Sequence, residues 1–98
     1  MSMLDEIRAK RDELYAIARR HKAERLWVFG SCARREERPD SDVDFLGKFG
    51  GRIGLLEYCR MENEMADLVG RPVEMTNSRV LRREPRFAVR VCKEAVEV

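Results

Sequence analysis

The chain has 98 residues, which is enough for one small domain, spanning residues 1–98, and too few for two. Leu, Ile, Val and Phe account for 24 of them, so a thin hydrophobic core can form. Lys and Arg total 20 against 18 Asp and Glu, and this net charge of +2 argues against direct binding to nucleic acid. No apolar run approaches the roughly 20 residues that cross a membrane or resembles a signal peptide, so we expect a cytoplasmic protein.

The first predicted element is an amphipathic helix from Ser2 to about His21, in which Ser2 and Asp5 can form a capping pair. The apolar run 26–29 predicts a buried strand that ends in a tight turn at Gly30-Ser31. Residues 32–40 alternate basic and acidic side chains and end near a proline, which allows only a short helix or a loop.

Residues 42–49 alternate carboxylate and apolar side chains, the pattern of a half-exposed strand. A glycine-rich loop over 49–54 separates this strand from a helix that ends at Gly70. The apolar stripe expected on that helix consists of Leu55, Leu56, Cys59, Ala66 and Val69. The later elements are a strand over 73–76, basic helical residues around 80–81 and a last helix over 87–96.

The three cysteines do not form a metal-binding pattern, and His21 is the only histidine, so the sequence argues against a zinc site. We expect Cys59 and Cys92 to be buried, reduced thiols. His21 is expected at the end of the first helix, without a catalytic part.

The most informative pattern is Gly30-Ser31 followed, after ten residues, by Asp42-Val43-Asp44. In a strand, Asp42 and Asp44 project from the same face, about 6 to 7 Å apart along the backbone. Two such carboxylates repel unless a cation lies between them, and Mg²⁺ prefers oxygen ligands together with water and phosphate. This pair therefore predicts a metal site.

The Gly30-Ser31 turn supplies the complementary half of the predicted site. A glycine lets the backbone approach phosphate, and the amides that open the next turn point at anions. Glu74 alternates with apolar residues in its strand and can face the same side, which makes it the candidate third carboxylate for two-metal chemistry. The residues fit neither a calcium-binding EF-hand loop nor a Walker loop.

Three stretches, 28–34, 41–45 and 70–76, resemble the minimal nucleotidyltransferases of the DNA polymerase beta superfamily. Their likeness is greatest to the MNT-domain antitoxins that pair with HEPN-domain toxins. The resemblance implies an α/β (α+β) nucleotidyltransferase fold, with a small mixed sheet of three to four strands and helices packed on one face. It extends from about residue 26 to residue 96.

The resemblance also assigns roles to individual residues. It makes Gly30 and Ser31 the turn that binds the triphosphate, with Arg34 as a basic residue that helps to hold phosphate. Asp42 and Asp44 become ligands of two Mg²⁺ ions. A third carboxylate, Glu74, stands where the family usually has Asp, and it would bind metal and accept the proton of the attacking hydroxyl.

Arg35 departs from the family pattern, because it replaces the glycine that commonly follows the preceding arginine. The loop backbone would differ if that position needs a positive φ.

The activity implied by the resemblance is transfer of AMP from ATP to a hydroxyl, which in the antitoxin group is a tyrosine of the HEPN-type toxin encoded by the adjacent gene. The toxin is thereby neutralised. The alternative is a catalytically impaired antitoxin that neutralises its partner by steric binding alone. A homo-oligomer is compatible with either hypothesis.

Overall fold

The computed structural model describes residues 2–98 and contains one four-stranded mixed sheet in the order β3-β2-β1-β4. Strand β1 pairs antiparallel with both β2 and β4, whereas β2 and β3 are parallel. This confirms the predicted α/β fold with a small mixed sheet. The strands are β1 (Ala23–Phe29), β2 (Val43–Phe49), β3 (Val73–Asn77) and β4 (Val96–Glu97). The helices are α1 (Met3–Ala9), α2 (Arg11–Arg20), α3 (Leu55–Val69), the 3₁₀ helix η1 (Ser78–Arg82) and α4 (Pro85–Glu94).

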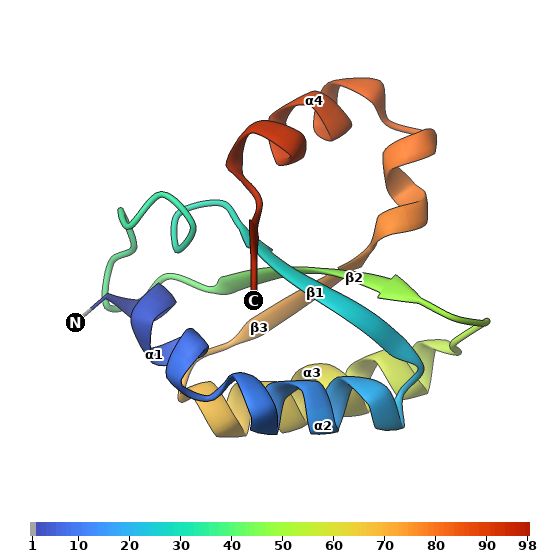
Figure 1. Cartoon of the computed structure of the whole chain (residues 1–98), viewed down its shortest axis with the longest axis horizontal. Coiled ribbons are helices and arrows are strands. Elements are labelled where there is room, and N and C mark those ends of the chain that lie inside the picture. Colours follow the sequence, from blue (N-terminus) through green and yellow to red (C-terminus); the bar gives the residue numbers. More distant parts are fainter. Residues whose placement is uncertain (1) are drawn as a thin grey trace.

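Helices cover both faces of the sheet, but unequally. Figure 1 shows α1, α2 and α3 packed beneath the sheet, whereas α4 lies above it, so α4 departs from the expected packing of the helices on one face. Helix α3 is the crossover between the parallel strands β2 and β3. Because side chains alternate along a strand, β2 contributes Phe45 to the layer below and Leu46 to the layer under α4. Both side chains are buried, so β2 is more covered than the predicted half-exposed strand.

The first predicted helix is two helices, which meet at Lys10. Ser2 and Asp5 form the expected capping box at the start of α1. Lys10 leaves the helical conformation with φ −103° and ψ 19°. Its side-chain amine donates to the carbonyl oxygen of Leu68 at 2.8 Å, which fixes the junction of α1 and α2 against the end of α3.

Helix α3 is present as predicted and ends at Gly70 in the left-handed conformation, but its buried face is different. Its buried residues are Met61, Met65 and Val69, which recur every four positions. Leu55 and Leu56 are 79% and 74% exposed, because the first turn of the helix precedes the part that packs against the sheet. Counting apolar residues without regard to this register placed both of them in the core.

The cysteines also correct the sequence expectation, since Cys59 and Cys92 are exposed while Cys32 is buried. Burial raises the pKa of the Cys32 thiol.

The end of the chain adds a strand where the sequence predicted helix. Helix α4 ends at Glu94, and Val96 then pairs with Val28 of β1. The Tyr15 hydroxyl donates to the carbonyl oxygen of Val98 and accepts from the Leu26 N–H, both at 3.2 Å. One buried hydroxyl therefore joins α2, β1 and the residues after β4.

Strand β3 forms one edge of the sheet, and a glutamate side chain hydrogen-bonds to one of its outward-pointing amides. Glu62 of α3 accepts a hydrogen bond from the Met75 N–H at 2.8 Å. This amide points away from β2, so the carboxylate takes the place of a neighbouring strand.

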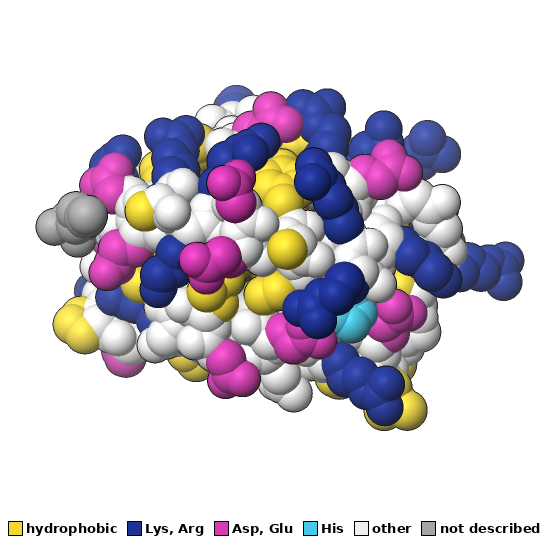
Figure 2. All heavy atoms as spheres, turned by 60° about the horizontal axis from the view of Figure 1, so that its bottom comes forward, with side chains coloured by type: hydrophobic (Ala, Val, Ile, Leu, Met, Phe, Trp, Pro, Cys, Tyr) yellow, Lys and Arg dark blue, Asp and Glu magenta, His cyan; other side chains and the backbone are white. Residues whose placement is uncertain are grey.

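The surface carries charges of both signs. Figure 2 shows basic and acidic side chains mixed over the face that comes forward, with the histidine between them. His21 caps the end of α2, as expected, and its ring contacts Glu57 at 3.3 Å and Glu64 at 3.1 Å on α3. Within residues 2–98, no helix has the length and apolar character needed to span a bilayer.

Two truncations test the packing of the core. Phe45→Ala should lower the free energy of unfolding by about 3 to 5 kcal/mol, because it leaves a cavity in the main core, where Phe45 is fully buried. The matched control Leu55→Ala should change it by less than about 0.5 kcal/mol, because that side chain is exposed. Chemical denaturation followed by circular dichroism measures both, and equal losses would contradict the assigned register of α3.

Candidate active site

The predicted carboxylates lie on the sheet face opposite α1, α2 and α3. Asp44 pairs in register with Phe29 of β1 on one side and with Glu74 of β3 on the other. Paired residues of neighbouring strands project to the same face, so Asp44 and Glu74 stand side by side. Asp42 lies two residues before Asp44, at the entry to β2, and is exposed like Glu74. The structure thus places all three carboxylates at one end of β2 and β3.

Asp44 is the most enclosed of the three carboxylates. Burial raises the pKa of Asp44, and the neighbouring carboxylates of Glu74 and Asp42 raise this pKa further. Arg90 and Arg34 act in the opposite direction, because their positive charges favour the ionised form. The site therefore holds excess negative charge that arginines only partly offset.

Gly30 follows β1 and lies directly against Asp44. Its φ of +74° is in the left-handed region, which favours glycine. A β-carbon at this position would lie 2.5 Å from the Asp44 Oδ2 atom, closer than van der Waals contact allows. The missing side chain of Gly30 is what makes room for the Asp44 carboxylate.

The turn after Gly30 presents backbone amides next to the carboxylates. Its internal bonds begin with the Arg34 N–H, which donates to the Gly30 carbonyl oxygen at 3.1 Å. In the part of the chain that the structure describes, the amides of residues 31–33 have no hydrogen-bond acceptor. The Cys32 thiol lies 3.8 Å from the Asp42 carbonyl oxygen and joins the turn to the entry of β2. Such open amides can bind an anion.

Arg34 points toward α4, where a residue that the sequence analysis did not identify meets it. The Arg34 Nη1 atom donates to Glu94 Oε1 at 2.9 Å, and the Gly30 N–H donates to Glu94 Oε2 at 3.1 Å. Glu94 lies 64 residues after Gly30 and belongs to no local motif. Only the pairing of β4 with β1 could have indicated this contact.

Arg35, which stands where the family commonly has glycine, adopts a left-handed backbone conformation. Its φ is +58°, which is strained for a residue with a side chain. The Arg35 guanidinium donates to the Ser2 hydroxyl at 2.6 Å and to Asp5 Oδ2 at 2.9 Å. This contact holds the pKa of Asp5 well below its ordinary value. The ion pair thus holds the side chain of this left-handed residue against the start of α1.

The donor set fits a hard divalent cation. Asp42, Asp44 and Glu74 form no ion pair among the described residues, and their carboxylate oxygens are ligands that Mg²⁺ prefers. Within residues 2–98, no three His, Cys, Asp or Glu side chains converge closely enough to enclose an ion by themselves. An ion at this face would therefore take one or two carboxylates and complete its shell with water or phosphate oxygens.

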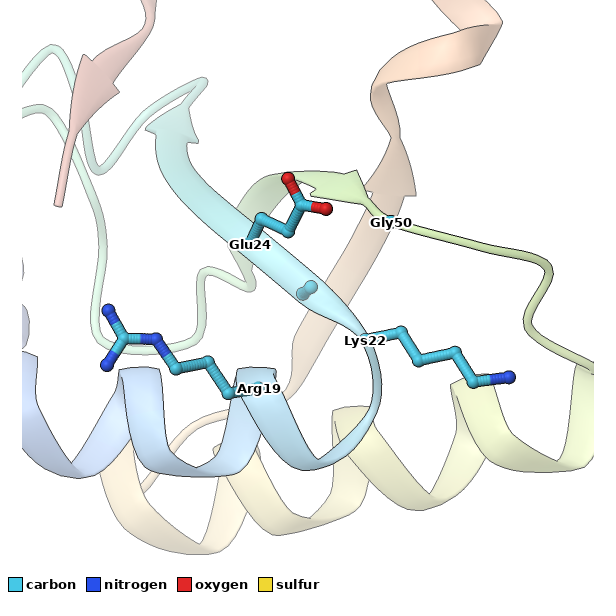
Figure 3. A pocket seen from close by; sticks show the side chains of 5 residues that line it. Arg19, Lys22, Glu24 and Gly50 are labelled. Atoms are coloured by element: carbon cyan, nitrogen blue, oxygen red, sulfur yellow. The ribbon is translucent and has the colours of Figure 1, made fainter.

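The surface hollows differ in their relation to these residues. One of about 370 Å³ lies at the opposite end of β1, against Ala23. Figure 3 shows the side chains of Arg19, Lys22 and Glu24 around it pointing away from one another, so they do not converge on a ligand. Another, of about 310 Å³, lies under α4 on the same sheet face as Asp44, and it is apolar, with Trp27 among its lining residues.

Comparison with known proteins decides the family. The sequence pattern described as polymerase beta, nucleotidyltransferase matches residues 12–98. The chain belongs to this nucleotidyltransferase family. A Methanocaldococcus jannaschii protein named as a candidate protein adenylyltransferase is 32% identical over 95 residues, 97% of each chain. A second such protein of that organism is 32% identical over 75 residues, 76% of this chain and 74% of its own.

Solved structures agree with the fold of this nucleotidyltransferase. A structure described as a candidate minimal nucleotidyltransferase matches with a TM-score of 0.81 and 37% identity, covering 100% of this chain and 97% of that one. A toxin–antitoxin structure with AMP-PNP matches at 0.72 and 15% identity, over 88% of this chain and 69% of that one. A complex of a tri-AMPylated Shewanella oneidensis HEPN toxin with MNT antitoxin matches at 0.68 and 12% identity, over 92% and 69%. At identities of 15% and 12%, these two matches show a shared fold.

Two glycine substitutions test the contact with Asp44. Gly30 and Gly70 have almost the same positive φ, but a β-carbon at Gly70 would meet no atom within 4 Å. Gly70→Ala should cost about 1 to 2 kcal/mol of stability through backbone strain alone. Gly30→Ala should cost at least about 1 kcal/mol more, because the methyl group must displace the Asp44 carboxylate. Urea denaturation of both variants measures the difference, and equal costs would contradict the close approach.

The raised pKa of Asp44 predicts a pH-dependent stability. The folded state binds the Asp44 proton more tightly than the unfolded chain does, so ionisation of this carboxyl destabilises the fold as the pH rises through its pKa. Asp44→Asn should therefore unfold at a higher temperature than the natural protein at neutral pH in metal-free buffer. This gain should shrink once the pH falls below the pKa of Asp44. Thermal melts across the acidic range measure it, and a gain that does not vary with pH would refute the assignment.

Proposed function

We propose that this nucleotidyltransferase transfers AMP from ATP to a tyrosine hydroxyl of a HEPN-type toxin and thereby neutralises the toxin. The observation that carries the proposal is the placement of Asp44 between Glu74 and the Gly30 turn, at the end of β2 where the carboxylates of Asp42 and Glu74 are exposed. The candidate protein adenylyltransferases among its relatives support the reaction. The shared fold with structures that contain AMP-PNP or an AMPylated HEPN toxin supports the nucleotide and the partner.

The proposed division of roles follows from the positions of the groups. The open amides of residues 31–33 and the Ser31 hydroxyl would bind the triphosphate, with the Arg34 guanidinium beside them. Asp42 and Asp44 would hold two Mg²⁺ ions, which when bound stabilise charge on the attacking and leaving oxygens. Among residues 2–98 the three carboxylates form no ion pair, which leaves their oxygens available for this role.

The transfer step forms a bond between the tyrosine oxygen and the α-phosphorus, while the bond from that phosphorus to the pyrophosphate oxygen breaks. Pyrophosphate leaves, and the tyrosine proton passes to a carboxylate. Glu74 is placed to accept it because it is exposed beside Asp44.

A protein acceptor suits the exposure of this end of β2 and β3. Asp42 and Glu74 are exposed, and no element of residues 2–98 closes over them. An exposed site of this kind can meet a tyrosine on the surface of another protein, and that protein would exclude water from the reacting groups. The partner thus completes the site that this chain provides.

Substitution of the two aspartates tests the proposal. Incubation of the purified protein with ATP, Mg²⁺ and the toxin encoded by the adjacent gene should add AMP to a toxin tyrosine, detected by mass spectrometry. Asp42→Asn/Asp44→Asn should reduce the rate at least about a hundredfold, because the site loses its principal negative charges. The matched control Asp67→Asn, on the exposed face of α3, should leave the rate unchanged.

Two results would count against this function. One is the absence of any AMP adduct on the toxin, and the other is equal labelling by the double variant. If the double variant still neutralises the toxin in cells at ordinary expression, neutralisation occurs by steric binding alone. Neutralisation by steric binding is a second candidate function, and it is motivated by Glu74, which stands where the family usually has aspartate.

A further inference from the structure

Glu94 occupies a position that continues the pairing of β4 with β1. Trp27 pairs with Glu97 and Val28 pairs with Val96. The same antiparallel register places residue 94 opposite Gly30, but residue 94 is the last residue of α4 and not part of the strand. The Glu94 carboxylate takes over the role of the missing strand, because its Oε2 atom accepts the Gly30 N–H at 3.1 Å. The turn is thereby fixed where the strand ladder ends.

The second oxygen of the same carboxylate fixes Arg34. Its Oε1 atom accepts from Arg34 Nη1 at 2.9 Å, while the other acidic partner of Arg34, Glu36, lies at 3.4 Å and is exposed. The Glu94 side chain is 17% exposed and that of Arg34 is 42% exposed. A charge-assisted hydrogen bond gains strength as water is excluded, so Glu94 is the partner that sets the position of the guanidinium.

Both groups that Glu94 holds act on the same carboxylate. Gly30 touches Asp44, and the positive charge of Arg34 acts on Asp44 from the turn. Through its two oxygens, Glu94 fixes these neighbours of Asp44 relative to each other. No other side chain of α4 hydrogen-bonds to both of them.

We propose that Glu94 is a positioning residue of the nucleotide-transfer site, which holds the Gly30 turn and the Arg34 guanidinium in the arrangement that receives the triphosphate. This inference rests on the proposed function for the reaction itself. It adds to that function a link between α4 and the turn, and it makes the end of α4 part of the site.

Two variants separate the two contacts. Glu94→Gln keeps an oxygen that can accept the Gly30 N–H but removes the charge that holds Arg34. It should therefore raise the KM for ATP several-fold, with kcat changed by less than about twofold. Glu94→Ala removes both contacts and should also lower kcat at least about tenfold, because the turn beside Asp44 loses its anchor. Glu94→Asp should fall between the natural protein and Glu94→Ala.

The matched control is Glu97→Gln. Glu97 also forms an ion pair across β1 and β4, with its Oε1 atom 2.6 Å from Arg25 Nη2, but this pair is half exposed and does not reach the turn. Glu97→Gln should leave both kcat and KM unchanged. An effect of Glu97→Gln equal to that of Glu94→Gln would overturn the proposal, because it would indicate a general loss of the β1–β4 pairing.

A readout that does not depend on catalysis is the amide of Gly30. Its hydrogen exchange, followed by NMR in the protein without nucleotide, should accelerate in Glu94→Ala and stay slow in Glu94→Gln. This result is expected even if the proposed AMP transfer is refuted, so the two failures can be told apart. Unchanged exchange of the Gly30 amide in Glu94→Ala would refute the contact on which the inference depends.

A double variant tests whether Glu94 acts through Arg34. Arg34→Ala should raise the KM for ATP, and the addition of Glu94→Gln to Arg34→Ala should raise that KM no further, because the lost charge of Glu94 acts on the KM only through Arg34. Additive effects would contradict the proposal. So would tighter ATP binding by Glu94→Ala, since Glu94 would then compete with the phosphates for Gly30 and Arg34.

Discussion

The close approach of the Gly30 backbone to the Asp44 carboxylate is the constraint on which the site depends. Antiparallel pairing brings the end of β1 to the start of β2, so the turn after β1 must pass beside the first acidic side chain of β2. A residue with a β-carbon would force the two apart. Because the contact is kept, open amides, a guanidinium and three carboxylates lie within one small region of the surface.

Part of this site follows from local pattern. Alternation along a strand is enough to place Asp42 and Asp44 on one face, and the glycine-serine turn after an apolar run marks where β1 ends. The sequence indicates one reason for glycine at position 30, which is a backbone that phosphate can approach. The fold adds a second reason, because the missing side chain makes room for the Asp44 carboxylate. Alternation also made Glu74 a candidate for the same face, but its place directly beside Asp44 depends on the parallel register of β2 and β3, which no spacing in the sequence reports.

Other features depend on contacts between distant segments, and these could not be predicted. Leu55 and Leu56 are as apolar as any core residue, but the helix register turns them to solvent while the methionines of α3 pack against the sheet. In the sequence, nothing distinguishes Glu94 from the other charged residues of its helix. Its contact with Gly30 depends on the pairing of β4 with β1. Arg35 departs from the family pattern, and its contacts with Ser2 and Asp5 could not be predicted because those residues lie about 30 positions earlier in the chain.

The hydrogen bond from the Met75 N–H of β3 to the Glu62 carboxylate affects how other proteins can bind at this edge of the sheet. A free strand edge invites a strand of another chain to extend the sheet, through backbone bonds that ignore side-chain identity. Here the incoming strand would have to displace an acidic side chain and would meet a strand of only five residues. Extension of the sheet by a strand of another chain is therefore disfavoured at this edge.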